Sequence, residues 1–197
     1  MEYLQPAGGI IGLFAYSLLI IALLRTNTEQ SFAAFLLWAL LDLIATVTTM
    51  IEGGNYWLAL SNALGSTVIT LVLVNKRQVS WSWVESMTAF LVIVCLVVWY
   101  ASGERAGIVA SSLAVVFASV PQMVDTFRKP ESTPLTPYLV FLVANIVSFV
   151  AGRNWLIEER FYQGCGIFLV VVIVVFALKK RRLKHIGHIG ENNLRRK

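Results

Sequence analysis

The chain has 197 residues, of which 57% are hydrophobic and 14% are charged, and its mean hydropathy is +0.73. Soluble domains carry roughly 25% charged residues, so this composition excludes an ordinary water-soluble domain. It predicts an all-α membrane protein, because helices satisfy their own backbone hydrogen bonds in lipid. The net charge of +5 does not indicate nucleic-acid binding, because the basic residues lie at the ends of apolar runs and in the C-terminal tail.

Seven apolar stretches are long enough to cross a bilayer, which takes about 20 predominantly apolar residues in one helix. Short polar connectors separate them, and tryptophan and tyrosine residues stand near their ends, where an aromatic belt is expected. We therefore predict seven transmembrane helices. In chain order they cover residues 7–24, 31–51, 56–74, 84–100, 106–127, 135–152 and 161–178.

The first stretch carries Gly8 and Gly12, four positions apart. Small residues at this spacing let two helices approach closely inside a membrane. The pattern predicts a close helix contact, either within this chain or between two copies of it, so a homo-oligomer is one of the alternatives.

The second stretch places a carboxylate, Asp42, near the centre of its helix, with Trp38 one turn before it on the same face. A charge at this depth costs about 3 kcal/mol on insertion scales, and intramembrane carboxylates mark solute or proton pathways. We expect Asp42 to contact a solute or to exchange a proton, and Trp38 to stack on the solute or wall it off. The alternative is a structural hydrogen bond between helices.

Polar side chains recur in the third and sixth stretches. Asn62 and Ser66 lie four apart on one helix face, and Asn145 and Ser148 lie near the middle of another helix. Amide and hydroxyl groups can bind the hydroxyls, amines or carboxylates of a small solute, and they can equally hold two helices together. We predict that all four belong to a solute site with Asp42, and helix–helix contact is the alternative.

An offset of 103 residues superposes the first three stretches on the last three. Arg25 then falls on Arg128, and Asp42 falls on Asn145. The fourth stretch has no strongly polar residue in its centre and no counterpart, so we interpret it as a linker. Parallel repeats around a mid-membrane site are typical of transporters. The predicted organisation is a first three-helix bundle at 1–77, a linker helix at 78–104, a second three-helix bundle at 105–180 and a basic tail at 181–197.

Pro121 and Gln122 lie inside the fifth stretch. Proline removes one backbone hydrogen bond and kinks a helix, and Gln122 can satisfy the groups that are freed. Asp125, one turn later, can meet Arg128 or Lys129 at the mouth of the bundle. The pattern predicts a hinge and gate, and a static kink is the alternative.

Basic residues set the expected orientation. Thirteen of the sixteen Lys and Arg residues fall on one side of the predicted spans, including eight in the tail from Lys179 to Lys197. The other three are Arg105, Arg153 and Arg160. Because basic residues concentrate in cytoplasmic connectors, we expect a cytoplasmic C-terminus and an outside N-terminus. Short connectors and a compact length favour a bacterial inner membrane.

Pro121-Gln122, residues 128–137 (RKPESTPLTP) and the following helix with Asn145 resemble the PQ-loop repeat. That repeat defines the SWEET-like sugar transporters and the lysosomal amino-acid exporters. The resemblance covers residues 110–180 and, more weakly, residues 7–77. It implies a three-plus-one-plus-three arrangement, an alternating-access mechanism in which Pro121 bends its helix, and Asn62 as a contact to the solute.

We therefore expect a transporter that moves a small polar solute, similar to an amino acid or a sugar, by alternating access, with or without coupling to protons. Two alternatives share the architecture: a membrane receptor or scaffold similar to the KDEL receptor, and a Pnu-type vitamin facilitator. An enzyme is disfavoured, because the chain has no HExxH motif and both histidines, His185 and His188, lie in the tail. We expect no metal and no other cofactor.

Overall fold

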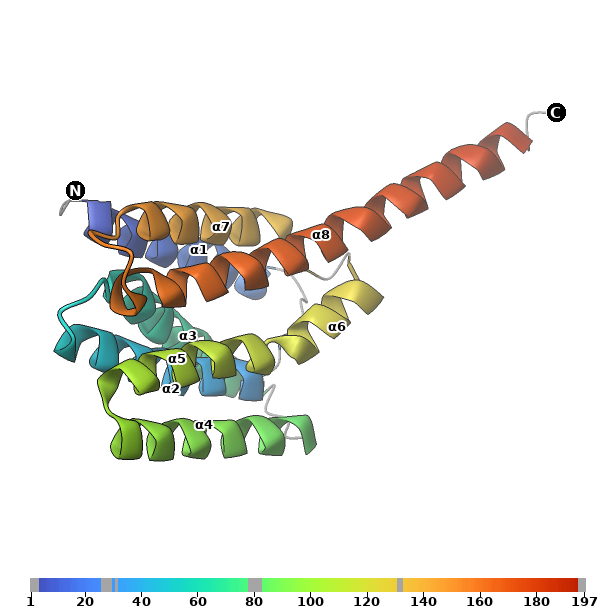
Figure 1. Cartoon of the computed structure of the whole chain (residues 1–197). Coiled ribbons are helices and arrows are strands. Elements are labelled where there is room, and N and C mark those ends of the chain that lie inside the picture. The colour runs from blue at the N-terminus through green and yellow to red at the C-terminus, as the bar shows by residue number, and fades with distance from the viewer. Residues whose placement is uncertain (1–3, 26–29, 31, 78–82, 131–132, 195–197) are drawn as a thin grey trace.

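The computed structural model describes residues 4–25, 30, 32–77, 83–130 and 133–194, and among these residues no strand occurs. The prediction of an all-α protein is confirmed, since nearly all of the described residues lie in helices (Figure 1). The helices are α1 (Leu4–Arg25), α2 (Phe32–Ile51), α3 (Trp57–Asn75), α4 (Trp83–Ser102), α5 (Glu104–Ala118), α6 (Val120–Arg128), α7 (Leu135–Val150) and α8 (Ile157–Leu194).

Length and composition divide the helices into two groups. At 1.5 Å per residue, α7 with its 16 residues reaches roughly 24 Å, which is less than a hydrocarbon core of about 30 Å. α7 and the segment Ala89–Ser102 of α4 are apolar but shorter than the other spans. By length and composition, the helices indicate an integral membrane protein. The segments long and apolar enough to cross a membrane are Leu4–Arg25, Phe32–Ile51, Trp57–Asn75, Glu104–Arg128 and Ile157–Leu178.

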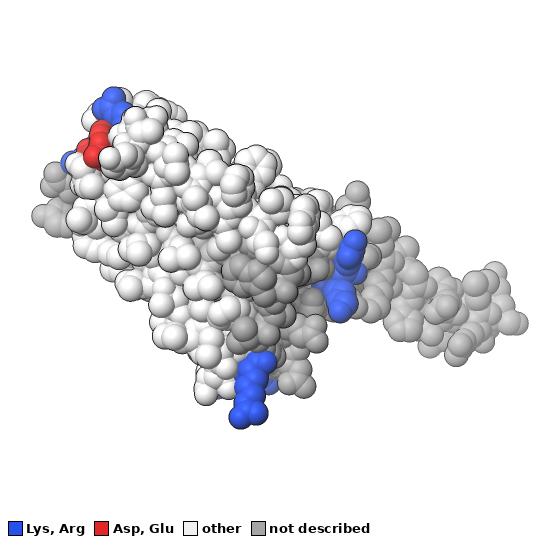
Figure 2. Space-filling view, turned by 90° about the horizontal axis from the view of Figure 1, so that it is seen from below, with Lys and Arg blue, Asp and Glu red and all other residues white. Residues whose placement is uncertain are grey.

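The outer surface of the described helices agrees with a lipid environment. Large apolar side chains stand exposed along it, among them Ile10 at 66% and Leu71 at 62% of their surface. Figure 2 shows the charged side chains gathered toward the ends of the molecule, with a broad uncharged surface between them. Soluble monomers rarely expose contiguous apolar patches larger than a few hundred Å². The apolar surface therefore faces lipid.

Divided by sequence, the helices form a first half, α1–α3, and a second half, α5–α8, and several helix contacts join the two. In the first half α3 packs against both α1 and α2, and in the second half α8 packs against both α5 and α7. Between the halves, α1 packs against α7 and α2 packs against α5. Under the offset of 103 residues α1 corresponds to α5 and α2 to α7, so these two contacts, the most extensive between the halves, map onto each other. α4 packs on the outside, against α5 and α2 (Figure 1).

Glycines allow α1 to approach both of its neighbours. A Cβ atom at Gly8 would lie 2.7 Å from the Cβ of Ser148 on α7, and one at Gly12 would lie 2.5 Å from the hydroxyl of Ser61 on α3. Side chains larger than hydrogen do not fit at either position. The glycine face that was expected to make a close contact is therefore buried within the chain, between α3 and α7.

Two glycines form turns at the end of the molecule where α1 begins. Gly53, between α2 and α3, has a φ of 68°, and Gly103, between α4 and α5, has a φ of 81°. Residues with a side chain rarely adopt this left-handed conformation, so glycine is favoured at both turns. α8 starts at the same end and runs past the opposite end of the bundle (Figure 1).

Candidate binding site

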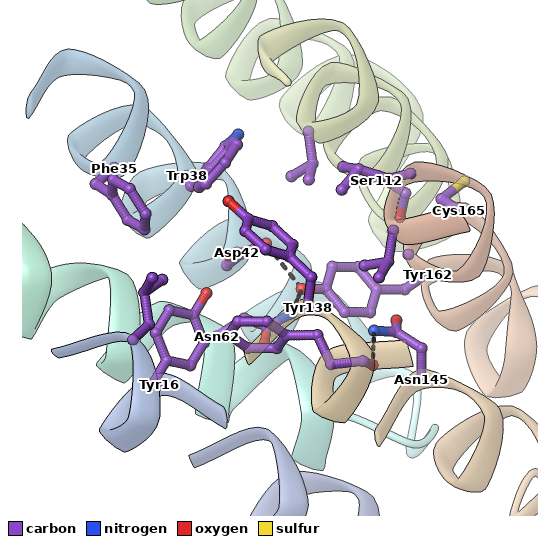
Figure 3. Close-up of a pocket in the computed structure, with 16 residues that line it drawn as sticks. Tyr16, Phe35, Trp38, Asp42, Asn62, Ser112, Tyr138, Asn145, Tyr162 and Cys165 are labelled. Carbon is purple, nitrogen blue, oxygen red and sulfur yellow. Dashed lines mark hydrogen bonds between the residues drawn. The ribbon is translucent and has the colours of Figure 1, made fainter. Parts of the chain in front are cut away.

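A cavity of about 70 Å³ lies between the two halves of the molecule (Figure 3). Residues of α1, α2 and α3 line it from the first half, and residues of α5, α7 and α8 line it from the second half. One water molecule needs at least about 10–15 Å³ of such volume, so the cavity suits a compact ligand. Six aromatic side chains line it: Tyr16, Phe35, Trp38, Tyr138, Phe141 and Tyr162.

Asp42 lies on the cavity wall and is only 3% exposed. Tyr162 of α8 donates a hydrogen bond of 2.8 Å to Asp42 Oδ1, and Asn62 of α3 donates one of 2.7 Å from its Nδ2 to the Tyr162 hydroxyl. Three side chains from three helices thus form one chain of hydrogen bonds (Figure 3). The expected neighbours Asp42 and Asn62 meet through Tyr162 rather than directly.

Asn145 lines the same cavity from α7 and is 3% exposed. Its Nδ2 donates a 2.8 Å hydrogen bond to the Phe141 carbonyl of its own helix, while its Oδ1 has no partner among the described residues. Gly166 of α8 lies against this oxygen, and a Cβ atom there would overlap it. The glycine therefore makes room for the amide. Asn145 shares the cavity with Asp42, as expected, and no hydrogen bond joins these two described side chains.

Further polar atoms of the cavity lining are buried without partners among the described residues. Besides Asn145 Oδ1, they are Trp38 Nε1, Asn62 Oδ1 and the Tyr138 hydroxyl. Trp38 is 8% exposed and Tyr138 is 4% exposed. A buried polar group without a hydrogen bond costs about 1–3 kcal/mol. Four such atoms around one cavity therefore indicate a site that a polar ligand completes.

The walls that α2 and α7 contribute repeat each other. Each helix presents two aromatic side chains and then an acid or amide, at spacing i, i+3 and i+7, which places all three on one helix face. The offset of 103 residues relates every member of one set to a member of the other. The two helices therefore contribute the same pattern of side chains to the cavity. The two sets are Phe35, Trp38 and Asp42 on α2, and Tyr138, Phe141 and Asn145 on α7.

Ser66 and Ser148 lie in helix contacts outside the cavity lining. Ser66 is fully buried and shares a 2.9 Å hydrogen bond with the Tyr16 hydroxyl, which orients a cavity residue. Ser148 is also fully buried, and Asn55 Nδ2 donates to its carbonyl at 2.9 Å and to its hydroxyl at 3.2 Å. The structure therefore places both serines in contacts between segments of the protein, which was the alternative. Neither serine lines the cavity in which we expected a contact with the solute.

The expected fifth span is interrupted at Ser119, where α5 ends and α6 begins with a change of direction (Figure 1). Pro121 lies two residues later and has no N–H for the carbonyl four residues before it, which weakens the helix at this point. Gln122 is buried, and its Nε2 donates to the Thr126 hydroxyl at 3.4 Å. The side chains of Pro121 and Asp125 lie outside the described part of the structure.

An ion pair and a side-chain hydrogen bond connect the two halves at the end where α1 begins. Glu159, 3% exposed, accepts hydrogen bonds from Arg153 Nη2 at 2.6 Å and from Gln5 Nε2 at 3.0 Å. Arg105, at the start of α5, contacts Glu52, at the end of α2, at 3.1 Å. Gln5 and Glu52 belong to the first half and their partners belong to the second, so these contacts hold the halves together at this end.

The residues expected from the sequence do not include five of the six aromatic lining residues: Tyr16, Phe35, Tyr138, Phe141 and Tyr162. For Tyr138 and Phe141 the offset of 103 residues is the signal, because it maps them onto two positions of α2 beside Asp42. Tyr162 has no such signal, because it shares a face of α8 with Cys165 and Gly166 and only the packing shows that this face lines the cavity.

The chain matches no protein-family model, no curated protein and no solved structure. The chemistry of the cavity is therefore the basis for assigning a function. In the part of the chain that the structure describes, no group of three or more His, Cys, Asp or Glu side chains gathers to hold a metal. The cavity instead combines a carboxylate, amide oxygens, an indole N–H and phenol hydroxyls within aromatic walls, which suits reversible binding of a small polar molecule.

Proposed function

We propose that this protein is a membrane transporter that moves a small polar solute by alternating access, with the cavity around Asp42 as its binding site. The observation that carries the proposal is the cavity between the two halves, where four buried polar atoms have no partner among the described residues. Other unpartnered buried atoms, Gln30 Oε1, Thr49 Oγ1, Asn55 Oδ1 and Gln163 Oε1, belong to residues outside the cavity lining, so the proposal rests on the four that belong to residues of one cavity.

The arrangement of the helices supports this mechanism. We propose seven spans in a three-plus-one-plus-three layout, in which α1–α3 and α5–α8 form two parallel repeats and α4 links them. The two contacts between the halves that map onto each other, α1 with α7 and α2 with α5, support a pseudo-twofold relation. Rocking of one half against the other would open the cavity to alternate sides. The resemblance to the PQ-loop repeat supports a hinge at Pro121 and Gln122, next to the break at Ser119.

For orientation we propose an outside N-terminus and a cytoplasmic C-terminus in a bacterial inner membrane. The distribution of basic residues supports this direction. The three arginines on the proposed outside are also engaged by the protein. Arg105 and Arg153 pair with glutamates, and Arg160 donates to main-chain carbonyls at 2.6 and 2.7 Å. All three guanidinium groups are therefore held by contacts within the protein at that end.

Uptake into liposomes tests the proposal. The purified full-length protein is reconstituted, and uptake of labelled neutral, anionic, zwitterionic and cationic small solutes is measured against protein-free liposomes. Asp42→Asn and Asn145→Ala should each reduce the initial rate for the transported solute by more than about tenfold, because each removes a buried polar contact to it. If every solute that enters does so equally well in both variants, this cavity is not the transport site.

The chain offers a matched pair of controls on α5. Ser111 and Ser112 are adjacent, are both fully buried, and both donate to carbonyls of their own helix, at 2.8 and 2.6 Å. Of the two, Ser112 lines the cavity. Ser111→Ala should therefore leave uptake unchanged, and Ser112→Ala should alter the apparent affinity for the solute.

A further inference from the structure

The charges around the cavity point to a class of solute. Asp42 is the one carboxylate on the cavity wall that the structure describes, and no Lys, Arg or His side chain is among the described lining residues. A buried carboxylate is unfavourable in a membrane interior until a proton or a positive partner neutralises it. A ligand that brings a positive charge would compensate it. A ligand that brings a carboxylate of its own would find no cation and would face Asp42.

Hydrogen-bond directions determine which atom of each amide is left without a partner in the described part of the structure. Tyr162 gives its only proton to Asp42, so its oxygen can only accept, and Asn62 must turn its Nδ2 donor toward it. Asn145 gives its Nδ2 to the Phe141 carbonyl, which also only accepts. Turning either amide over would lose its bond. Both amides therefore keep their oxygens without a donor among the described residues, and both residues line the same cavity as Asp42.

Aromatic rings complete the surroundings of a positive charge. Phe141 packs edge-on against Tyr16 with ring centroids 4.7 Å apart, and Phe35 packs edge-on against Trp38 at 4.9 Å. Cations are attracted to the faces of such rings, most strongly where water is excluded. The Trp38 indole N–H, a donor without a partner among the described residues, is available to a hydroxyl on the ligand.

We propose that the solute is a compact protonated amine, whose N–H groups donate to Asp42, Asn62 Oδ1 and Asn145 Oδ1 within the aromatic walls. This inference rests on the proposed transport function and names its substrate class. A neutral sugar would leave the Asp42 charge uncompensated, an amino acid would add an unpaired carboxylate, and a quaternary ammonium ion would have no N–H for the amide oxygens. The site therefore prefers a primary amine, and an amino alcohol also uses Trp38.

Binding to the purified full-length protein tests the class with matched probes. Ethanolamine and propylamine are compared with their neutral counterparts, ethylene glycol and 1-propanol, and with β-alanine and choline, by calorimetry and by the shift in unfolding temperature. Both amines should bind saturably and raise the unfolding temperature, whereas the neutral and zwitterionic probes should not. Choline should bind more weakly than ethanolamine, because it cannot donate to the amide oxygens.

Variants then connect binding to the cavity. Asp42→Asn should lower the affinity for ethanolamine by about 30-fold or more, because it removes the charge partner of a buried cation. Asn62→Ala and Asn145→Ala keep the carboxylate and should each lower the affinity for ethanolamine by about tenfold. These two variants keep the test decisive if Asp42→Asn does not fold. Ser111→Ala, outside the cavity lining, should bind ethanolamine as the wild type does.

The possible results separate the two proposals. The inference is overturned if neither amine binds more tightly than its neutral counterpart, or if the cavity variants bind amines as the wild type does. Saturable, Asp42-dependent uptake of a neutral or anionic solute would refute the amine class and leave transport standing. Amine binding that depends on the cavity, without uptake of any solute class, would support the amine site and refute transport.

Discussion

The hydroxyl of Tyr162 donates a 2.8 Å hydrogen bond to Asp42 Oδ1 across 120 residues of chain, from the second half of the molecule to the first. The cavity lies between the same two halves, so a relative movement of α8 and α2 would stretch or break this bond. Whether Asp42, the one cavity carboxylate that the structure describes, keeps this hydrogen bond therefore depends on how the two halves are arranged. It also fixes the direction of the neighbouring Asn62 amide.

Replacing Tyr162 by Phe should show how much this bond contributes. The change keeps the ring but leaves Asp42 without its donor and Asn62 Nδ2 without its acceptor. We therefore expect the free energy of unfolding to fall by about 1–3 kcal/mol and uptake to become slower. Thermal unfolding in detergent and liposome uptake measure the two effects. Tyr56→Phe is the control, because Tyr56 stacks on Trp57 outside the cavity lining. Equal stability of the two variants would contradict the role of Tyr162.

Two glycines at the start of α8 should respond in opposite ways to alanine. A Cβ atom at position 166 would overlap Asn145 Oδ1, whereas one at position 164 would meet only Phe149 at an ordinary 3.6 Å. Gly166→Ala should therefore displace the amide, cost about 1–3 kcal/mol and weaken ligand binding. Gly164→Ala should be neutral or stabilise by about 0.4–1 kcal/mol. Unfolding temperature and ethanolamine affinity are measured for both, and a tolerated Gly166→Ala would disprove the close approach of α8 to Asn145.

The ion pairs at the α1 end should differ in their contributions to stability. Arg153→Ala leaves Glu159, whose side chain is 3% exposed, without its cation, and we expect a loss of about 2 kcal/mol or more. Arg105, 63% exposed, pairs with Glu52 at 3.1 Å and also with the buried Glu158 at 3.3 Å, so Glu52→Ala breaks only the exposed pair and should cost less than about 1 kcal/mol. Thermal unfolding at low and at high salt separates them, because salt screens the more exposed pair more strongly. Equal losses in both variants would rule out the difference in burial as the cause.

The sequence predicts what local patterns determine. Continuous apolar stretches predict the helices, because lipid requires every backbone group to be paired within its segment. Asp42 and Asn145 stand out because a polar group at membrane depth is rare, and both lie on the cavity wall. Ser66 and Ser148 have the same kind of signal, yet they lie in helix contacts. A hydroxyl can satisfy a neighbouring helix or a ligand equally well, and only the packing decides between the two.

The sequence does not predict contacts that depend on how distant helices pack. Tyr162 reads as one more aromatic residue near a helix end, where an interfacial position is the usual expectation. Its hydrogen bond to Asp42 requires α8 to lie close to α2. The same position of α8 brings Gly166 against Asn145 of α7. The break at Ser119 is similar, since Pro121 indicates a weak point but not the residue at which the helix ends.

A reporter joined to the C-terminus should determine the orientation. Green fluorescent protein fluoresces only on the cytoplasmic side, because it does not become fluorescent when it is exported unfolded. Alkaline phosphatase is active only on the outer side of a bacterial inner membrane. Fused after Lys197, the fluorescent reporter should be active and the phosphatase inactive, because the basic residues favour a cytoplasmic C-terminus. The opposite pattern would reverse the proposed direction of the protein and leave the cavity unchanged.

Restoring the backbone N–H at position 121 should separate binding from movement. Pro121→Ala supplies the donor that the carbonyl four residues earlier lacks, and alanine favours a continuous helix across the break at Ser119. Pro121 is not among the lining residues that the structure describes, so the affinity for ethanolamine should stay within about twofold of the wild type. If the break is a hinge, the initial rate of uptake should fall by about tenfold, since conformational steps often limit turnover. Calorimetry and liposome uptake measure the two quantities, with Val120→Ala, an exposed neighbour, as the control. Unchanged uptake with a continuous helix would show that the break is a static kink.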